Sequence, residues 1–273
     1  MIKTKFKSVI DSISHAKRFD YSTVTYGWHK KSLGIKFQKE EGSHEWLRIS
    51  DHLTEDAART QATRILNSNS FAGIKKPKIY ETSILKYNGI FWSIILMSYH
   101  KGKSMSSTPS LKDLNSEVSA HFLSDIKNQL DNLSTNDSLY VAYRQELITR
   151  RIQERYHSNI DTIVKDWVVV HGDLHWANIS FDGFIFDWEG YGIGPRGIDI
   201  AFLYLFSLMN NYTKKLIENI FCDYFSLRQF KICLLFGVSE LMRMTEIYND
   251  HPELYSHLKE VGIKTHRDLE CEL

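Results

Sequence analysis

The chain has 273 residues, which is enough for one large domain or two lobes of ordinary size. Its 34 basic and 33 acidic residues are spread along its length and give a formal net charge of +1, so nothing indicates a polyanion-binding surface or a nucleic-acid partner. Three cysteines without a CxxC pair indicate reduced thiols of a cytoplasmic protein. The longest apolar run, residues 89–97, is far shorter than the ~20 residues that span a bilayer, and the Lys-rich opening lacks a cleavage site, so we expect neither a membrane span nor a signal peptide.

The first part of the chain has the pattern of a small antiparallel sheet with one helix. Alternating residues rich in β-branched and aromatic types predict strands at 21–27, 33–39, 45–50, 76–84 and 90–99. Between the third and fourth of these, residues 50–68 carry apolar side chains at helical spacing, with Ser50 or Asp51 as the candidate N-cap. The predicted order is therefore three strands, one helix and two strands.

The second part is predicted to be mainly helical. Residues 100–110 are rich in Gly, Ser, Lys and Pro and have no periodicity, so we expect them to connect two lobes. Apolar residues three and four apart then predict helices at 111–133, 139–164, 196–210, 213–225 and 229–248. The sequence thus predicts an α+β protein.

The stretch Val168–Gly190, VVVHGDLHWANISFDGFIFDWEG, places His, Asp and Asn side chains between short apolar runs. The pair Asp182-Gly183 favours a two-residue hairpin turn, which would make Asn178 and Asp187 cross-strand neighbours with Cβ atoms about 5 Å apart. An amide oxygen and a carboxylate at that separation can bind one hard cation. Asp173 follows a hydrophobic strand on the loop that enters this hairpin, where it can act as a base or a nucleophile.

These residues resemble a known family. The sequence HGDLHWAN at 171–178, followed by FDWE at 186–189, resembles the catalytic loop and metal motif of the aminoglycoside phosphotransferase and choline kinase superfamily, distant relatives of protein kinases. The resemblance implies a bilobal protein-kinase-like α+β fold. Its N-lobe, residues 1–98, would hold a five-stranded antiparallel sheet and one main helix. A hinge at about 97–102 would lead into a mainly helical C-lobe, residues 99–273, with a catalytic hairpin and an acceptor pocket.

The resemblance also implies an activity, in which ATP and Mg²⁺ serve to phosphorylate a hydroxyl of a small molecule. The acceptor would be an aminoglycoside-like antibiotic, a sugar, a nucleoside or an amino alcohol. Asp173 would be the catalytic base, and Asn178 and Asp187 would hold magnesium. His171 and Asp199 would support the catalytic loop.

The same resemblance implies a set of nucleotide-binding residues in the first part. Arg48 stands where the family has a phosphate-positioning lysine, and Glu55 is the candidate helix partner of that residue. Ser32 or nearby backbone amides would contact the phosphates, although the loop lacks GxGxxG. The backbone from Met97 to Tyr99 would contact the adenine.

Several side chains keep two interpretations. His175 either packs in the core or contacts the acceptor or metal, and Glu189 is a ligand, a substrate contact or a solvated acid. Four acids of the later helices either attract a cationic acceptor or form the outer face of amphipathic helices: Glu218, Glu240, Glu246 and Asp250.

Two other functions fit parts of the pattern. A pseudokinase or nucleotide-binding regulatory module would explain Arg48 and the absence of a well-placed helix glutamate. A two-metal phosphoesterase would need further Gly-Asp and Gly-Asn-His segments, but residues 172–173 are the only Gly-Asp and Gly-Asn-His is absent. We therefore set the phosphoesterase aside, and the oligomeric state stays open.

Overall fold

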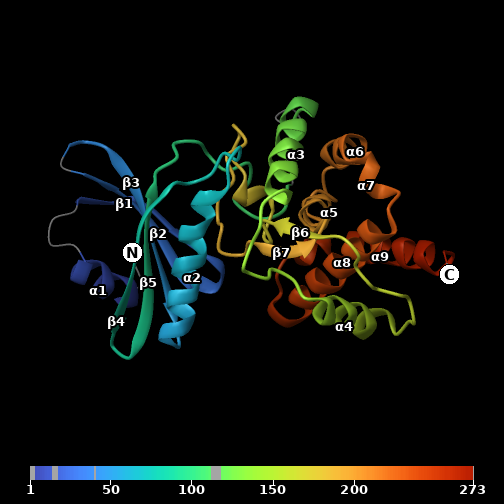
Figure 1. Cartoon of the computed structure of the whole chain (residues 1–273), viewed down its shortest axis with the longest axis horizontal. Coiled ribbons are helices and arrows are strands. Elements are labelled where there is room, and N and C mark those ends of the chain that lie inside the picture. Colours follow the sequence, from blue (N-terminus) through green and yellow to red (C-terminus); the bar gives the residue numbers. More distant parts are fainter. Residues whose placement is uncertain (1–3, 14–17, 40, 112–117, 273) are drawn as a thin grey trace. The chain divides into compact units, whose positions relative to one another are not determined.

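The computed structural model describes the chain except for residues 1–3, 14–17, 40, 112–117 and 273 (Figure 1). The chain forms two compact units, of which the first comprises Met1–Ser70 and Lys76–Lys101 and the second comprises Phe71–Lys75 and Gly102–Leu273. The first unit contains a β-sheet and the second is mainly helical, so the predicted α+β class is confirmed.

The first unit is built on a five-stranded antiparallel sheet with strand order β1-β2-β3-β5-β4. Its strands are β1 (Arg18–Tyr26), β2 (Ser32–Gln38), β3 (His44–His52), β4 (Ile79–Tyr87) and β5 (Ile90–Ser98). All five predicted strands are present. Arg48 lies in the middle of β3, in register with Gly34 of β2 and Ile95 of β5.

Two helices of the first unit are α1 (Thr4–Ile13) and α2 (Glu55–Asn67). Phe6 of α1 is fully buried in one apolar cluster with Ile94 of β5, while Ile65 of α2 belongs to a second cluster with Ile95. Successive residues of a strand point to opposite faces. The two helices therefore cover opposite faces of the sheet.

The start of α2 differs from the prediction. Strand β3 continues through His52, and Thr54 is the N-cap, with its hydroxyl accepting a hydrogen bond from the Ala57 N–H at 3.2 Å. The proposal of Ser50 or Asp51 as N-cap was wrong because the polar residues before the helix still belong to the strand.

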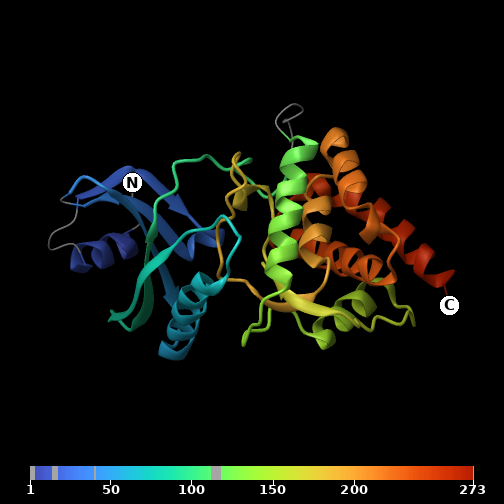
Figure 2. The same cartoon turned by 45° about the horizontal axis from the view of Figure 1, so that its top comes forward.

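The second unit packs its helices around one large apolar core. Its elements are α3 (Ala120–Ser134), α4 (Gln145–Tyr156), β6 (Trp167–Val170), β7 (Gly192–Pro195), α5 (Ile198–Leu205), α6 (Asn211–Ile220), α7 (Cys222–Phe225), α8 (Arg228–Tyr248) and α9 (Tyr255–Glu270). Helices α3 and α6 lie side by side in both views (Figure 1, Figure 2). Helix α9, which packs on α8, is absent from the predicted set. Among the described residues, no helix has the length and apolarity needed to cross a membrane.

Two of the predicted helices have different ends in the structure. The helix predicted over 139–164 is limited to α4, because the Ala142 N–H donates to the Ile193 carbonyl of β7 at 2.9 Å and His157 ends the helix in the left-handed conformation, with φ 49°. Helix α3 begins after Ser119, whose hydroxyl accepts from the Phe122 N–H at 3.1 Å. Most of the earlier part of the helix predicted over 111–133 lies outside the described residues.

The hairpin at Asp182-Gly183 is present, but its loop is longer than predicted. The Ser180 N–H donates to the Phe184 carbonyl at 2.9 Å, which leaves three residues between the paired positions instead of two. Gly183 has φ +77° and its N–H donates to the Ser180 carbonyl at 2.9 Å. This is the geometry of a type I turn followed by a left-handed glycine.

The longer loop shifts the register of the hairpin by one residue. The Phe186 N–H donates to the Asn178 carbonyl at 2.8 Å, so Asn178 lies opposite Phe186 and not opposite Asp187. Asp187 follows in the left-handed conformation, with φ +57°. The predicted direct pairing of Asn178 with Asp187 was therefore wrong, although both residues remain at the open end of the same hairpin.

The segment that was expected to connect the lobes also contacts this hairpin. It has irregular backbone, as predicted, but Ser104 forms a β-bridge with Ser180. The Met105 N–H donates to the Ile179 carbonyl at 2.7 Å, and the Met105 side chain is buried. One strand of the hairpin thus gains a backbone partner on its outer edge.

Gln129 of α3 fixes the turn of the hairpin from the other side. Its Nε2 donates to the Gly183 carbonyl at 2.9 Å, and its Oε1 accepts from the Lys75 N–H at 2.8 Å. The Lys75 carbonyl in turn accepts from the Ile185 N–H at 2.8 Å. One buried amide therefore connects the helix, the turn and the segment Phe71–Lys75.

Replacing Gln129 should destabilise the second unit. Gln129→Leu keeps the side-chain size but removes both hydrogen bonds, so we expect a loss of about 2 kcal/mol in the free energy of unfolding. The control is Asn132→Ala on the same helix, because the Asn132 side chain is exposed and reaches the Gly73 carbonyl only at 3.4 Å. Urea denaturation followed by circular dichroism measures both variants. Equal losses would contradict the role of Gln129.

Candidate active site

The loop that carries Asp173 begins at the end of β6 and is held by Asp199, in the first turn of α5. One carboxylate oxygen of Asp199 accepts from the His171 N–H at 2.7 Å, and the other accepts from the Gly172 N–H at 2.9 Å. Asp199 is buried, and burial raises the pKa of its carboxyl group, while the nearby His171 and the two N–H donors oppose the rise. The two hydrogen bonds fix the backbone just before Asp173.

His171 is fully buried and uses both ring nitrogens on the backbone. Nδ1 lies 3.3 Å from the Asp173 N–H and accepts from it, whereas Nε2 lies 2.8 Å from the Phe186 carbonyl. Since a carbonyl can only accept, the ring proton is on Nε2. His171 therefore joins the loop to the second strand of the hairpin and has no nitrogen left to carry a proton to a substrate.

Asp173 and Asn178 lie together at the end of this loop. The Asp173 carboxylate is 53% exposed, whereas Asn178, in a short 3-10 turn, is buried. Nδ2 of Asn178 donates to the Asp173 carbonyl at 2.9 Å. Within the part of the chain that the structure describes, Oδ1 of Asn178 has no hydrogen-bond donor, so this oxygen is available to a ligand.

The donor set at the end of the hairpin suits a hard cation such as Mg²⁺. It offers the amide oxygen of Asn178 and the carboxylate of Asp187. Asp187 is the residue directly after Phe186, which pairs with Asn178 in the hairpin. Over the described residues there is no group of three or more His, Cys, Asp or Glu side chains that could hold a metal.

His175 is neutral at neutral pH. Burial lowers the pKa of its imidazole to about 4, against the opposing charge of Asp187. Its ring packs edge-on against Phe206 with centroids 5.8 Å apart, and its Nε2 lies 3.2 Å from Nδ2 of Asn178. Of the two interpretations of His175, the structure gives a packed side chain that also touches the candidate cation ligand.

Two further residues shape the loop, and neither was among the predicted site residues. Tyr143 lies just before α4 and donates its hydroxyl to the Gly172 carbonyl at 2.7 Å, and burial raises the pKa of the phenol well above its ordinary value. Gly172 has φ +82°, and a Cβ atom there would lie 2.4 Å from the Gly190 carbonyl oxygen. Only glycine fits this conformation and this close approach.

The candidate nucleotide-binding residues all belong to the first unit. Ser32 is buried at the start of β2, and Arg48 is half-buried in the centre of the sheet. Met97 is buried near the end of β5, and Tyr99 stacks on Trp46 with centroids 6.1 Å apart. The register of the strands sets the places of Ser32, Arg48 and Met97 within the sheet.

Glu55 lies at the exposed start of α2. Its carboxylate forms an ion pair with Arg59, one turn further along the helix, at 2.6 Å. Gln61 of α2 contacts polar groups of the sheet: its Oε1 accepts from the Ser93 hydroxyl at 2.6 Å and lies 2.9 Å from Nε2 of His52.

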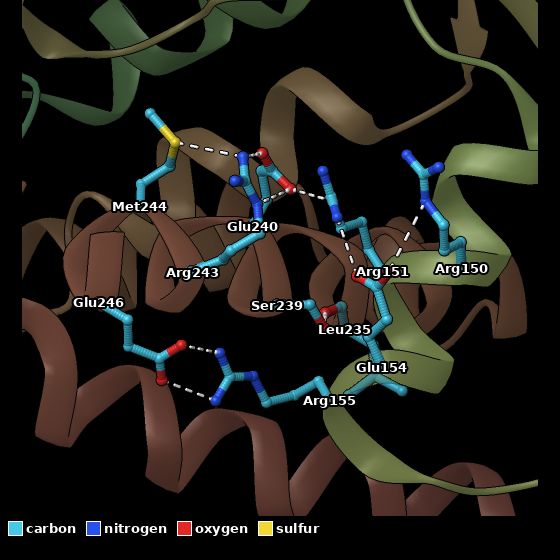
Figure 3. Close-up of polar contacts among 10 residues, drawn as sticks. All are labelled: Arg150, Arg151, Glu154, Arg155, Leu235, Ser239, Glu240, Arg243, Met244 and Glu246. Atoms are coloured by element: carbon cyan, nitrogen blue, oxygen red, sulfur yellow. Dashed lines mark hydrogen bonds and ion pairs between the residues drawn. The ribbon is translucent and has the colours of Figure 1, made fainter. Parts of the chain in front are cut away.

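The acids considered for a cationic acceptor have partners in the structure. Glu246 of α8 forms a two-pronged ion pair with Arg155 of α4, with N–O distances of 2.8 and 2.7 Å (Figure 3). Glu240 contacts Arg151 of α4 at 2.9 Å and also Arg243 (Figure 3). Glu218 accepts from the Tyr204 hydroxyl at 3.0 Å. Glu240 and Glu246 are thus neutralised within the second unit.

The comparisons with known proteins agree with the expected family. Residues 113–231, which include the loop and the hairpin, match the model of the phosphotransferase enzyme family APH. The chain matches no curated protein sequence. The predicted resemblance to aminoglycoside phosphotransferases is thus supported over residues 113–231.

Solved structures extend the likeness to nearly the whole chain. An amicoumacin kinase, hAmiN, in complex with AMP-PNP, Ca²⁺ and Ami superposes with a TM-score of 0.60 at 12% identity, covering 97% of this chain and 93% of that chain. A thermostable mutant of aminoglycoside phosphotransferase APH(4)-Ia gives 0.64 at 11%, covering 96% and 98%. Spectinomycin phosphotransferase APH(9)-Ia with ADP and spectinomycin gives 0.56 at 13%, covering 95% and 98%. The chain therefore has the protein-kinase-like fold of these enzymes.

The conformation of Gly172 gives a test of the loop. Gly89→Ala places a side chain at a positive φ in open space and should cost about 1 kcal/mol of unfolding free energy. Gly172→Ala adds the collision with Gly190 and should cost about 2 kcal/mol or more. Thermal and urea denaturation of both variants measure the difference. Equal losses of unfolding free energy in the two variants would mean that the loop accommodates the added methyl group at residue 172 without extra strain.

Tyr143→Phe should loosen the loop. The variant loses the hydrogen bond to Gly172, so we expect about 1 kcal/mol less stability and faster amide hydrogen exchange in residues 171–178. Tyr204→Phe is the control, because Tyr204 bonds Glu218 instead of the loop. Hydrogen–deuterium exchange with peptide mass analysis compares the two. Unchanged exchange of the loop in Tyr143→Phe would refute its role.

Proposed function

We propose that the protein is a kinase that transfers the γ-phosphoryl group of ATP to a hydroxyl of a small molecule with the help of Mg²⁺. The observation that carries the proposal is the pairing of a half-exposed carboxylate, Asp173, with the amide of Asn178 on a loop fixed by Asp199. The match to a phosphotransferase family model over this region supports it.

Each residue of the loop has a role in the proposed reaction. Asp173 accepts the proton of the attacking hydroxyl and orients it, which is the task of a base in phosphoryl transfer. Asn178 Oδ1 and Asp187 hold magnesium, which neutralises charge on the phosphates when bound. Asp199 and His171 keep the backbone of the loop in place through the hydrogen bonds described above. A nucleophilic side chain is not needed.

The N-terminal unit, residues 1–98 with a hinge at about 97–102, is proposed to bind the nucleotide. Arg48 would hold phosphate through its guanidinium group. Ser32 and the backbone from Met97 to Tyr99 would contact the phosphates and the adenine. Glu55, which forms an ion pair with Arg59, is the proposed partner of Arg48.

The acceptor is proposed to bind in the helical part, residues 99–273. The similar structures contain AMP-PNP with Ca²⁺ and Ami in one case and ADP with spectinomycin in another. These ligands support a nucleotide, a divalent cation and a hydroxylated small molecule as partners. We propose an aminoglycoside-like antibiotic, a sugar, a nucleoside or an amino alcohol as acceptor, and a cytoplasmic site of action, where ATP is present.

A panel assay tests the activity. The full chain with ATP, Mg²⁺ and single hydroxylated compounds should release ADP above background with at least one of them. Asp173→Ala should lower kcat by about 1,000-fold or more, because general-base catalysis and orientation of the acceptor are lost together. A coupled assay of ADP release measures the kcat of the unmodified chain and that of Asp173→Ala.

A thermal-shift titration with ATP and Mg²⁺ provides the control. Asp173→Ala should keep most of the nucleotide-dependent rise in Tm, since Asp173 is proposed to act on the acceptor. Retained turnover in this variant would refute the assignment of the base. Nucleotide binding without turnover on a broad panel would favour a nucleotide-binding module instead of a kinase.

A further inference from the structure

His175 contacts Asn178 through one ring nitrogen whose protonation can be deduced. Nε2 of His175 lies 3.2 Å from Nδ2 of Asn178, and the same Nδ2 donates to the Asp173 carbonyl at 2.9 Å. An amide nitrogen carries two protons and accepts nothing. Nε2 must therefore be the acceptor, and the single proton of the neutral ring is on Nδ1.

The alternative arrangements bring like groups together. If the Asn178 amide were turned over, its oxygen would face the carbonyl and carboxylate oxygens of Asp173, which lie 2.9 and 3.4 Å from the present nitrogen. If Nε2 of His175 carried the proton, it would point at the amide protons. The Asp173 carboxylate is 3.8 Å from Nε2, too far to accept a hydrogen bond in their place.

The other ring nitrogen supplies an independent observation. Nδ1 of His175 is buried without a hydrogen-bond partner in the part of the chain that the structure describes. A buried polar atom without a partner is unfavourable, so its presence calls for an explanation. His171, five residues before the start of the turn that holds Asn178, has the opposite tautomer and has both ring nitrogens hydrogen-bonded.

We propose that His175 is a positioning residue, which accepts a hydrogen bond from the Asn178 amide and so presents the Asn178 oxygen to the cation. The proposal rests on the proposed function, in which Asn178 is a magnesium ligand. Without the acceptor at Nε2, the amide of Asn178 would lose one of its two anchors and could present its NH₂ group to the cation. The ring proton is then on Nδ1, without a partner, because Nε2 must stay unprotonated to accept the hydrogen bond.

NMR of the full chain labelled with ¹⁵N-histidine tests the tautomer without any reaction. Long-range ¹H–¹⁵N correlations should show His175 protonated on Nδ1 and His171 protonated on Nε2, with each signal assigned by its loss in a His→Gln variant. His171 serves as the internal reference for the opposite tautomer. A proton on Nε2 of His175 would overturn the proposal.

Two substitutions separate hydrogen bonding from packing. His175→Gln can place an amide oxygen near the position of Nε2, whereas His175→Leu fills the space without an acceptor. Electron paramagnetic resonance of Mn²⁺ added to the ADP-loaded full chain should show affinity lowered about 10-fold in His175→Leu and largely kept in His175→Gln. Equal affinity in both variants and the unmodified chain would overturn the role of His175.

The same titration in Asn178→Asp distinguishes positioning from a general loss of structure. A carboxylate offers oxygen on both sides, so His175→Leu should have little further effect in that background. An equal drop in both backgrounds would show a merely structural role and overturn the proposal.

If Asn178→Ala leaves Mn²⁺ affinity unchanged, the cation site of the proposed function fails as well. If Asn178→Ala weakens Mn²⁺ binding but His175→Leu leaves the affinity unchanged, only the inference about His175 is overturned.

Discussion

The arrangement of the candidate site depends on one buried carboxylate, that of Asp199, and on its two backbone hydrogen bonds. These bonds hold the residues directly before Asp173, while the left-handed conformation of Gly172 turns the chain so that Asp173 emerges toward solvent. A buried acid is costly unless its oxygens find donors. The loop provides those donors, so the stability of α5 and the geometry of the loop are coupled.

The hairpin is positioned by contacts that come from distant parts of the chain. Gln129 bonds its turn, Lys75 bonds one strand, and Met105 bonds the other. The hairpin itself is short, and a two-stranded ribbon of this kind has little stability alone. Its partners make the placement of Asn178 a property of the whole second unit, and His171 adds the link from the loop to the opposite strand through the Phe186 carbonyl.

Local patterns in the sequence predicted the five strands, most helices and the presence of the hairpin, because alternation, helical spacing and Asp-Gly turns act over a few residues. They did not predict the register of the hairpin, since Asp-Gly suits both a two-residue turn and a three-residue loop. Only Gly183, and not Asp182, has a positive φ, and this decides between them. Tyr143 and Gln129 gave no signal because their partners lie far away in sequence. The roles of Asp173 and Asn178 as base and ligand stay predictions.

The acids of α8 show why helical spacing alone could not define the acceptor site. An acidic residue on an amphipathic helix looks the same in sequence whether it faces solvent, a ligand or a neighbouring helix. In the structure, α4 brings Arg151 to Glu240 and Arg155 to Glu246 (Figure 3). A cationic acceptor could bind these glutamates only by breaking the ion pair of Arg151 with Glu240 or the two charge-assisted hydrogen bonds of Arg155 with Glu246. Selection of a cationic acceptor by these two acids is therefore unfavourable.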